Sequence, residues 1–327
     1  MTMRRSLLPC LLFAFAVAPT ACSSSRAADD SSLLDTTVTP NVLRDLGFTA
    51  LAPAPTANAN LVSLGRDLFY EARLAPKTAE SRGCFSCHGT KTYGVNPTIV
   101  RRRNVPTVFN LNGQKAFYWD GRAATLEVQA TMAMTNPDEM GHPNVASADA
   151  ALAAIAPDYK ARFKDAFGDE AVSLDRAATS IAAYEKQLVT PAPIDDALTT
   201  GNTILTAKQE DGASTFAALC STCHNGPSLR GDGLRKGRSY QAVPDLGRFD
   251  VTGNDADKFL FAVPGLRNVE KTAPYFHDGS AATLKDAITY MAENQAQALL
   301  SPEDVENIAE FLKTLTGSVP EIAAAKP

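Results

Sequence analysis

The chain is poor in the residues that several common classes of protein require. Its 327 residues include one tryptophan, four histidines and six cysteines. No apolar run beyond the N-terminus approaches the roughly 20 residues of a membrane-spanning helix. A net charge of −5 and an isoelectric point near 5.5 give no reason to expect nucleic acid as a partner. Cys10 and Cys22 lie in or at the end of a leader, and the spacing of the other cysteines leaves no pair for a structural disulfide.

Those other cysteines form two CxxCH motifs, Cys84-Phe85-Ser86-Cys87-His88 and Cys220-Ser221-Thr222-Cys223-His224. A CxxC pair alone also occurs in zinc knuckles and redox dithiols. A histidine follows directly in both motifs, which favours covalent haem attachment. The cysteines would bond the porphyrin, and His88 and His224 would ligate the iron. The sequence therefore predicts two covalently bound haem c groups.

Residues 1–22 are typical of a secretion signal, with two arginines before an apolar stretch too short to span a bilayer comfortably. The end of this segment resembles a bacterial lipoprotein cleavage site with Cys22 as the lipidated residue. Pro19 fits that pattern poorly, so ordinary cleavage nearby stays an alternative. Residues 23–58, rich in Ser, Thr, Ala and Pro, are expected to form a tether and a short surface segment.

The rest of the chain repeats itself. Three pairs of segments are similar: 119–126 with 277–284, 103–105 with 267–269, and the Gly-x-x-x-Phe spacing of Gly65 and Phe69 with that of Gly212 and Phe216. In each pair, one segment lies in the half of the chain with the first CxxCH motif, and the other lies in the half with the second. We therefore expect an N-terminal domain over 59–192 and a C-terminal domain over 193–320, linked at Pro191-Ala192-Pro193.

Helical signals dominate both halves. Leu61, Leu64 and Leu68 form an apolar stripe at helical spacing. Ser301 is a candidate N-cap, with Pro302 and acidic residues in the first turn. Residues 147–190 indicate two more helices, and little strand is expected. The predicted fold is all-α, with two cytochrome c-like domains in tandem, each carrying one covalent c-type haem.

The repeat also predicts that the two haems differ. A thioether as sixth iron ligand raises the reduction potential and fills the site, whereas an open position lets peroxide bind. Met291 stands in the second repeat where the first has Ala133, with Met132 and Met134 out of register. A methionine on a helix is more often core filling, but this repeat position favours Met291 as a ligand of the C-terminal haem.

The chain resembles the bacterial di-haem cytochrome c peroxidases, a family that includes the MauG-type enzymes. The resemblance covers roughly residues 60–317. It rests on both CxxCH motifs and on segments 64–70, 103–110, 119–122, 136–140 and 272–279, which read LGRDLFY, RNVPTVFN, WDGR, NPDEM and TAPYFHDG.

The resemblance implies roles for particular residues. Met291 falls on the distal ligand of the electron-transfer haem, with Tyr290 as runner-up because MauG-type enzymes have a tyrosine there. Trp119 falls on the tryptophan between the haems, where an electron-relay role competes with that of a buried core aromatic. Gln129 and Glu139 fall on the peroxidatic pocket: Glu139 would move a proton as base and then acid, and Gln129 would hold the peroxide by hydrogen bonds.

Asn104 and the carbonyls of Thr272 and Pro274 fall on a calcium site between the halves, and such oxygen ligands suit calcium. His277 is expected to be structural or to bind a haem propionate. The basic run at residues 101–103 is equally compatible with a solvated loop and with propionate binding.

The chain departs from the family pattern in one respect. Many members close the N-terminal haem with a histidine in the loop after the first CxxCH motif, but residues 89–103 contain none. His142 is expected in an exposed turn beside Pro143. We therefore predict an N-terminal haem that is five-coordinate or water-bound at rest.

The expected function is reduction of hydrogen peroxide to water in the bacterial periplasm, with electrons from a small cytochrome c or a cupredoxin. A MauG-like oxidase that modifies a partner protein is the alternative. A pure di-haem electron carrier is a third hypothesis, which Gln129, Glu139 and Ala133 argue against. Family members are often homodimers, and the sequence indicates no particular interface.

Overall fold

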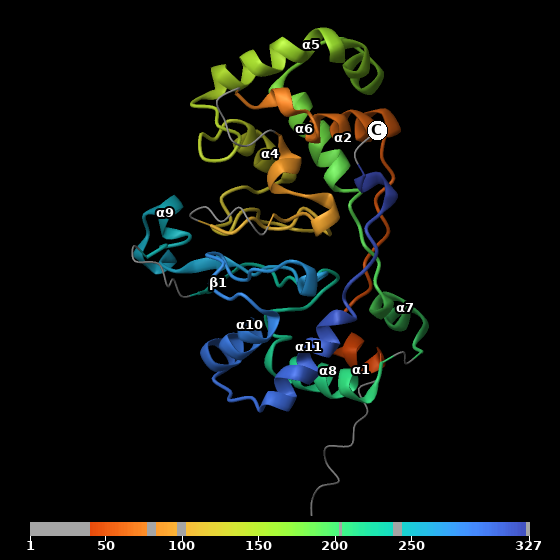
Figure 1. The fold of residues 1–327 in the computed structure, drawn as a ribbon, viewed down its shortest axis with the longest axis vertical. Coiled ribbons are helices and arrows are strands. Elements are labelled where there is room, and N and C mark those ends of the chain that lie inside the picture. Colours follow the sequence, from red (N-terminus) through yellow and green to blue (C-terminus); the bar gives the residue numbers. More distant parts are fainter. Residues whose placement is uncertain (1–39, 77–82, 97–102, 203–204, 238–243, 325–327) are drawn as a thin grey trace, which may run out of the picture. The chain divides into compact units, whose positions relative to one another are not determined.

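The computed structural model describes residues 40–76, 83–96, 103–202, 205–237 and 244–324, and the fold of these ranges is mainly helical (Figure 1). The α-helices are α1 (Pro40–Asp45), α2 (Ala59–Phe69), α3 (Cys84–Cys87), α4 (Leu126–Met134), α5 (Val145–Phe167), α6 (Leu174–Glu185), α7 (Pro193–Thr200), α8 (Ala207–Leu219), α9 (Phe249–Thr252), α10 (Leu284–Met291) and α11 (Pro302–Lys313). Short helical turns are Ala72–Leu74, Thr90–Thr92, Asp255–Asp257, Val269–Lys271, Ala292–Ala296 and Glu321–Ala323. Strands β1 (Leu234–Lys236) and β2 (Leu260–Ala262) pair antiparallel, with Arg235 opposite Phe261. The all-α prediction is confirmed apart from this small ribbon.

The N-terminal half is built on a close crossing of α2 and α6, which α4 and α5 flank. At Gly65 a Cβ atom would lie 1.7 Å from the Ser180 carbonyl oxygen, so only glycine allows this approach. One turn later Phe69 packs against Tyr184, with ring centroids 5.3 Å apart. The crossing anchors the core of this half.

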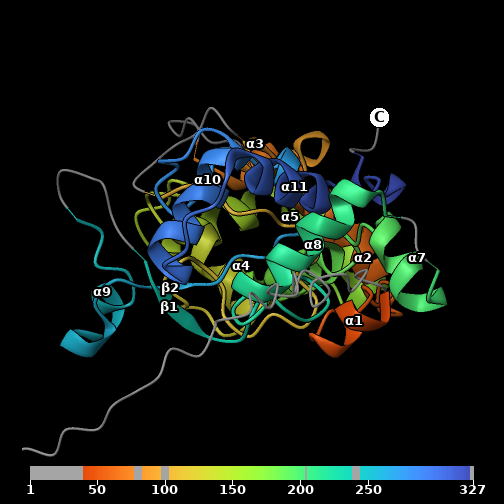
Figure 2. The ribbon, with the colours of Figure 1, turned by 90° about the horizontal axis from the view of Figure 1, so that it is seen from below.

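The C-terminal half repeats the crossing with α8 and α11, which lie side by side (Figure 2). A Cβ atom on Gly212 would lie 1.9 Å from the Asn307 carbonyl oxygen. Phe216 packs against Phe311 at 5.4 Å between ring centroids. The repeated Gly-x-x-x-Phe spacing thus has one physical cause: glycine permits the crossing, and phenylalanine fills the core beside it.

Two predictions about helices are confirmed. The Ser301 hydroxyl accepts a hydrogen bond from the Asp304 backbone N–H at 3.1 Å, and the Asp304 carboxylate accepts one from the Ser301 N–H at 3.0 Å. This capping box starts α11 where the sequence predicts it. The two helices expected within 147–190 are α5 and α6, and Phe163 and Ile181 are buried there.

Residues near each end of the described chain pack on the distant half. Leu43 on α1 and Phe48 after it are buried in the C-terminal core. The tether predicted over 23–58 is therefore wrong for residues 40–48, because these two apolar side chains need a core to cover them. Residues 23–39, like the predicted signal over 1–22, lie outside the described residues.

The turn Glu321–Ala323 makes the opposite exchange and belongs to the N-terminal core. The Tyr70 hydroxyl donates a hydrogen bond to the Ala323 carbonyl at 2.6 Å. Each half is thus completed by a segment from the other end of the chain, visible as the long connections beside α7 in Figure 1.

The structure fixes the register of the internal repeat through matching features in both halves. These are the bridges Phe117–Ala123 and Tyr275–Ala281, the N-caps Thr125 and Thr283, and the left-handed residues Asn110 and Asn268. The match of 119–126 with 277–284 is confirmed. The match of 103–105 with 267–269 is wrong, because Asn268 corresponds to Asn110 and not to Asn104.

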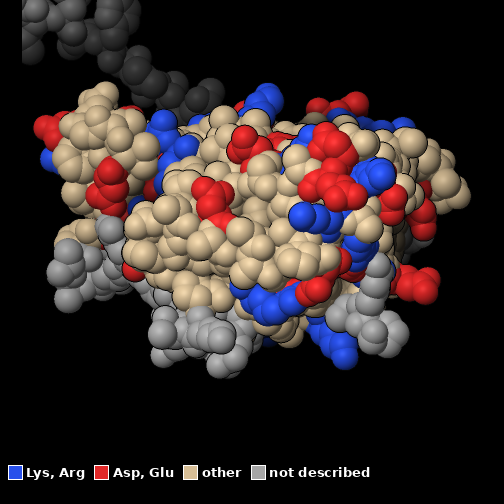
Figure 3. Space-filling model, turned by 90° about the horizontal axis from the view of Figure 1, so that it is seen from above, with Lys and Arg blue, Asp and Glu red and all other residues tan. Residues whose placement is uncertain are grey.

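The surface gives no sign of a membrane-crossing element within the described ranges, where no helix is both long and apolar enough to cross a bilayer. On the face drawn in Figure 3, acidic and basic side chains are interspersed among uncharged ones.

Candidate functional site

A cavity of about 740 Å³ runs through both halves and is lined by residues of both CxxCH motifs. Its walls include Cys84, Cys87 and His88 from the first motif, and Cys220 and His224 from the second. Cys223 is not among the lining residues. The four motif cysteines are outside any disulfide, and three of them, Cys84, Cys87 and Cys220, line one common space.

The two motif histidines are held in the same way. The Nδ1 atom of His88 lies 3.0 Å from the Gly94 carbonyl oxygen, and that of His224 lies 3.1 Å from the Leu229 carbonyl oxygen. A carbonyl requires a proton on Nδ1, which leaves Nε2 with a lone pair for a metal. Burial lowers the pKa of both imidazoles, which favours this neutral form.

The two predicted sixth positions also line the cavity. Met291 reaches it from the last turn of α10, and Ala133 from the equivalent turn of α4. Tyr290, the alternative to Met291, is not among the lining residues, and its ring packs on Phe276 at 5.0 Å. The geometry therefore favours Met291 over Tyr290.

Glu139 lies in the N-terminal part of the cavity, where several donors hold its carboxylate. Oε1 accepts hydrogen bonds from Asn136 Nδ2 at 2.7 Å and Arg122 Nη2 at 3.2 Å, and Oε2 accepts one from the Tyr118 hydroxyl at 3.1 Å. Three donors favour the ionised carboxylate, the form that accepts a proton. Gln129 lines the same part of the cavity, so the structure brings the predicted pair together.

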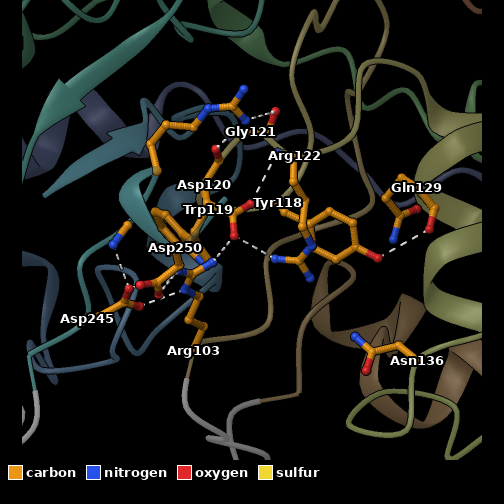
Figure 4. Close-up of polar contacts among 12 residues, drawn as sticks. Arg103, Tyr118, Trp119, Asp120, Gly121, Arg122, Gln129, Asn136, Asp245 and Asp250 are labelled. Atoms are coloured by element: carbon orange, nitrogen blue, oxygen red, sulfur yellow. Dashed lines mark hydrogen bonds and ion pairs between the residues drawn. The ribbon is translucent and has the colours of Figure 1, made fainter. Parts of the chain in front are cut away.

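Tyr118 is a member of this site that sequence reasoning missed. Its hydroxyl contacts the Gln129 carbonyl at 3.2 Å as well as Glu139, and the Arg122 guanidinium lies 3.5 Å from the centre of its ring (Figure 4). Burial raises its pKa, so it stays a donor. The internal repeat contained a signal for Tyr118, because its equivalent in the C-terminal half is Phe276, which has no hydroxyl.

Trp119 lies between the halves. Its indole Nε1–H donates to the Asn104 carbonyl at 2.8 Å, and its own carbonyl accepts a hydrogen bond from Ala262 N–H at 2.7 Å. Its ring centroid is 6.3 Å from that of His277, its repeat equivalent. Trp119 also lines the cavity, and this position is compatible with a relay.

An ion-pair chain continues from the Glu139 site to the C-terminal half (Figure 4). Arg122 bonds Asp120 at 2.8 Å, and Asp120 also pairs with Arg103. Arg103 in turn bonds Asp245, whose carboxylate is fully buried, at 2.6 Å. Arg103 is therefore not a solvated loop residue, and its guanidinium is not available for a propionate alone because it already pairs with two carboxylates. Residues 101 and 102 lie outside the described ranges.

The residues predicted to bind calcium lie close together. The Asn104 side-chain amide is 2.6 Å from the Pro274 carbonyl oxygen and 3.2 Å from that of Phe276, and Thr272 lines the same cavity. As oriented, the amide nitrogen faces these carbonyls; rotation of the amide would present Oδ1 to the same space.

Comparison with known proteins identifies the family. The model of the family "Di-haem cytochrome c peroxidase" matches residues 59–203, and the cytochrome c model matches residues 209–316. The chain is 38% identical over 278 residues to cytochrome c551 peroxidase of Nitrosomonas europaea, covering 81% of this chain and 82% of that protein. The chain belongs to the di-haem cytochrome c peroxidase family.

Other relatives of this peroxidase agree. Cytochrome c551 peroxidase of Pseudomonas aeruginosa is 40% identical, with 79% of each chain covered. Methylamine utilization protein MauG of Methylorubrum extorquens is 30% identical, with 80% of this chain and 81% of that protein covered. A solved MauG-like protein associated with microbial copper homeostasis superposes with a TM-score of 0.68 at 27% identity, covering 85% of this chain and 95% of that one.

The residues present fit haem c. The cavity exposes thiols of both motifs, and each motif histidine has its Nε2 left for iron. Imidazole and thioether are ligands that haem iron takes. The peroxidase therefore has an appropriate donor set for two haems, with the Met291 thioether at one predicted sixth position and Ala133, which cannot ligate iron, at the other.

His142 differs from the prediction. It is buried, with 1% of its surface exposed, and its Nε2 lies 2.6 Å from the Leu74 carbonyl oxygen. Its Nδ1 lies 2.9 Å from the Ser147 hydroxyl. The expectation of an exposed turn is wrong, because these two partners draw the ring into the core. It does not line the cavity.

Glu185 was also missed. It ends α6 and lines the cavity, with 4% of its surface exposed. In the other half, Leu312 occupies the equivalent place on α11, since Ser180 and Asn307 are equivalent at the helix crossings. Burial, followed by the charge of Glu127, raises the Glu185 pKa to about 8.

Proposed function

We propose that this protein reduces hydrogen peroxide to water in the bacterial periplasm, with electrons from a small cytochrome c or a cupredoxin. The observation that carries the proposal is the position of Glu139 and Gln129 in the same part of the cavity as Ala133. Glu139 is a proton acceptor and Gln129 a hydrogen-bonding amide, and the side chain of Ala133 near them cannot ligate iron. An electron carrier with both irons saturated needs neither.

The chain would hold its haems through Cys84, Cys87 and His88, and through Cys220, Cys223 and His224. When bound, the haems would supply the iron that binds the peroxide and the electrons that reduce it. Met291 would complete the coordination of the C-terminal haem, which suits it to electron entry. Trp119, between the halves, would relay electrons to the N-terminal haem.

Glu139 would accept a proton from the inner peroxide oxygen and return it to the outer one, which leaves as water. The three donors around its carboxylate fix its direction before peroxide arrives. Gln129 would orient the peroxide and stabilise the developing charge by hydrogen bonds. The net reaction takes two electrons and two protons and releases two waters.

The N-terminal haem is proposed to be five-coordinate or water-bound at rest. The loop of residues 89–103 contains no histidine, and His142 is bonded to Leu74 and Ser147. Met134 and Met140 also line the cavity and are the residues to examine if the site proves closed.

The decisive experiment is peroxide-dependent oxidation of a ferrous small cytochrome c, started with fully ferric enzyme. Immediate turnover is expected, with Glu139→Gln strongly impaired and Glu127→Gln, a change on the outer side of α4, as the matched control. Recovery of activity only after half-reduction would mean that another ligand closes the site. Persistent inactivity would refute the proposal and favour the MauG-like oxidase.

Three further parts of the proposal concern the setting of the enzyme. Asn104, with the carbonyls of Thr272 and Pro274, would bind one calcium ion, which their closeness to one another supports. Cys22 would carry a lipid anchor on the exported protein. A homodimer is proposed from the resemblance alone.

A further inference from the structure

Arg230 places an unusual charge in the C-terminal haem site. It follows Leu229, whose carbonyl orients the His224 imidazole, and its side chain lines the cavity. Its Nε is buried without a hydrogen-bond partner. Within the described residues, the guanidinium makes no ion pair or hydrogen bond. The residue as a whole is half-buried.

An arginine whose guanidinium is largely out of water normally pairs with a carboxylate. In the same half of the chain, Arg267 is buried and is paired with Asp195 at 2.7 Å and 3.0 Å. Burial without a counter-charge lowers the Arg230 pKa to about 10, far too little to neutralise it near pH 7. An unpaired charge that is largely out of water is costly, so a negative group in the cavity beside Arg230 would be stabilised.

The internal repeat shows that the charge belongs to one site only. His88 and His224 bond Gly94 and Leu229, and the next residues are Val95 and Arg230. Both of these residues line the cavity.

A second position also differs between the two halves of the repeat. Gly265 stands opposite Arg230, and its equivalent in the N-terminal half is Thr107. A Cβ atom on Gly265 would lie 3.2 Å and 3.4 Å from two guanidinium nitrogens. The glycine leaves room for the larger side chain, so the C-terminal site is shaped around Arg230.

We propose that Arg230 binds a carboxylate of the C-terminal haem and that its charge raises the reduction potential of this haem. The inference rests on the proposed function, since it concerns the haem assigned to electron entry. Haem propionates are the carboxylates that the cofactor brings into this cavity, and a guanidinium binds a carboxylate in a bidentate manner.

The electrostatic reason is simple. Reduction removes one positive charge from the iron, so a nearby fixed cation stabilises the reduced state relative to the oxidised one. Arg230 is close to the iron site, because it directly follows Leu229, whose carbonyl oxygen lies 3.1 Å from His224 Nδ1. Low dielectric in the cavity strengthens such an effect. The C-terminal haem would therefore accept electrons first, and Met291 would act in the same direction.

The test compares Arg230→Leu, Arg230→Lys and the exposed Arg235→Leu as control, each as holoprotein with both haems attached. Spectroelectrochemical titration gives both potentials. For Arg230→Leu we expect the reduction equilibrium of the C-terminal haem to fall at least tenfold, about 59 mV for one electron. Arg230→Lys should fall less, because the charge is kept and the bidentate geometry is lost. The N-terminal haem and Arg235→Leu should be unchanged.

A second readout is the resonance Raman band of propionate bending, which should shift in Arg230→Leu. An unchanged C-terminal potential in a folded Arg230→Leu protein would overturn the inference, as would a shift confined to the N-terminal haem. If Arg230→Leu fails to fold, Arg230→Gln takes its place, since it keeps a polar side chain without the charge, and an unaltered C-terminal potential in that protein overturns the inference equally. A wild-type enzyme without peroxidase turnover, but with the expected potential shifts, would overturn the proposed function and leave this inference standing.

Discussion

The buried carboxyl of Glu185 should give this enzyme a stability that falls as pH rises. Lys186 does not neutralise it, because the Lys186 ammonium bonds Glu127 at 2.6 Å instead. Glu185 Oε2 has no hydrogen-bond partner. The folded protein therefore keeps the carboxyl protonated, with a pKa raised from 4.5 to about 8.

The size of the effect follows from the linkage between protonation and folding. Between these two pKa values the unfolded chain loses the proton while the folded chain keeps it, so the folded state binds more protons and loses stability as pH rises. At 1.36 kcal/mol for each pKa unit, the rise from 4.5 to about 8 corresponds to roughly 5 kcal/mol. This contribution is fully present below 4.5, declines through neutral pH and is gone above about 8.

The assay is urea unfolding of the holoprotein, followed by far-UV circular dichroism between about pH 5 and about pH 8. Glu185→Gln keeps the shape of the side chain and removes the titration, so its free energy of unfolding should fall much less over this range. Glu185→Leu imitates Leu312 of the other half and should behave in the same way. Exposed Glu170→Gln is the control. Parallel pH profiles for wild type and Glu185→Gln would refute the reasoning.

Four further predictions concern activity, electron transfer and packing. Glu139→Gln should lower kcat by about 10²–10⁴ in steady-state peroxide assays, since it removes the proton acceptor; a loss below tenfold would contradict the role. Met291→Ala should lower the C-terminal potential in a redox titration and let carbon monoxide bind that haem when reduced; an unaltered spectrum would exclude Met291 as ligand. Trp119→Phe should slow electron transfer between the haems in stopped-flow experiments while peroxide binding is retained. Gly65→Ala should destabilise the fold by about 1–3 kcal/mol in urea, because its Cβ atom would press on Ser180, and an unchanged midpoint would count against the crossing.

Local sequence signals predicted much of this architecture. Ser301 and Asp304 form the expected capping box because a cap needs only residues within one turn. Gly65 and Gly212 were recognised as a repeated feature, but their purpose depends on a helix that comes far later in the chain. The exchange of Phe48 into the C-terminal core left no local trace, since one aromatic residue in a Ser- and Pro-rich stretch has no periodicity.

The candidate site divides in the same way. The CxxCH motifs, Met291 and Ala133 were found by spacing and by repeat position, and each lies where that reasoning placed it along the cavity, apart from Cys223. Tyr118 and Glu185 were missed because a tyrosine or an acid on a helix or loop is usually solvated. His142 was misassigned because a turn beside proline reads as surface.

By itself the sequence determined the two haem-attachment motifs and predicted the difference between Met291 and Ala133, because these depend on residue type, short spacing and repeat position. Tertiary structure alone decided which charges are satisfied. Arg267 pairs with Asp195 and Arg103 pairs with Asp245, whereas the Arg230 Nε has no hydrogen-bond partner among the described residues. Charge pairing depends on contacts between residues distant in sequence, and burial sets its strength. That is why the asymmetry between Val95 and Arg230 became visible only when the chain was folded.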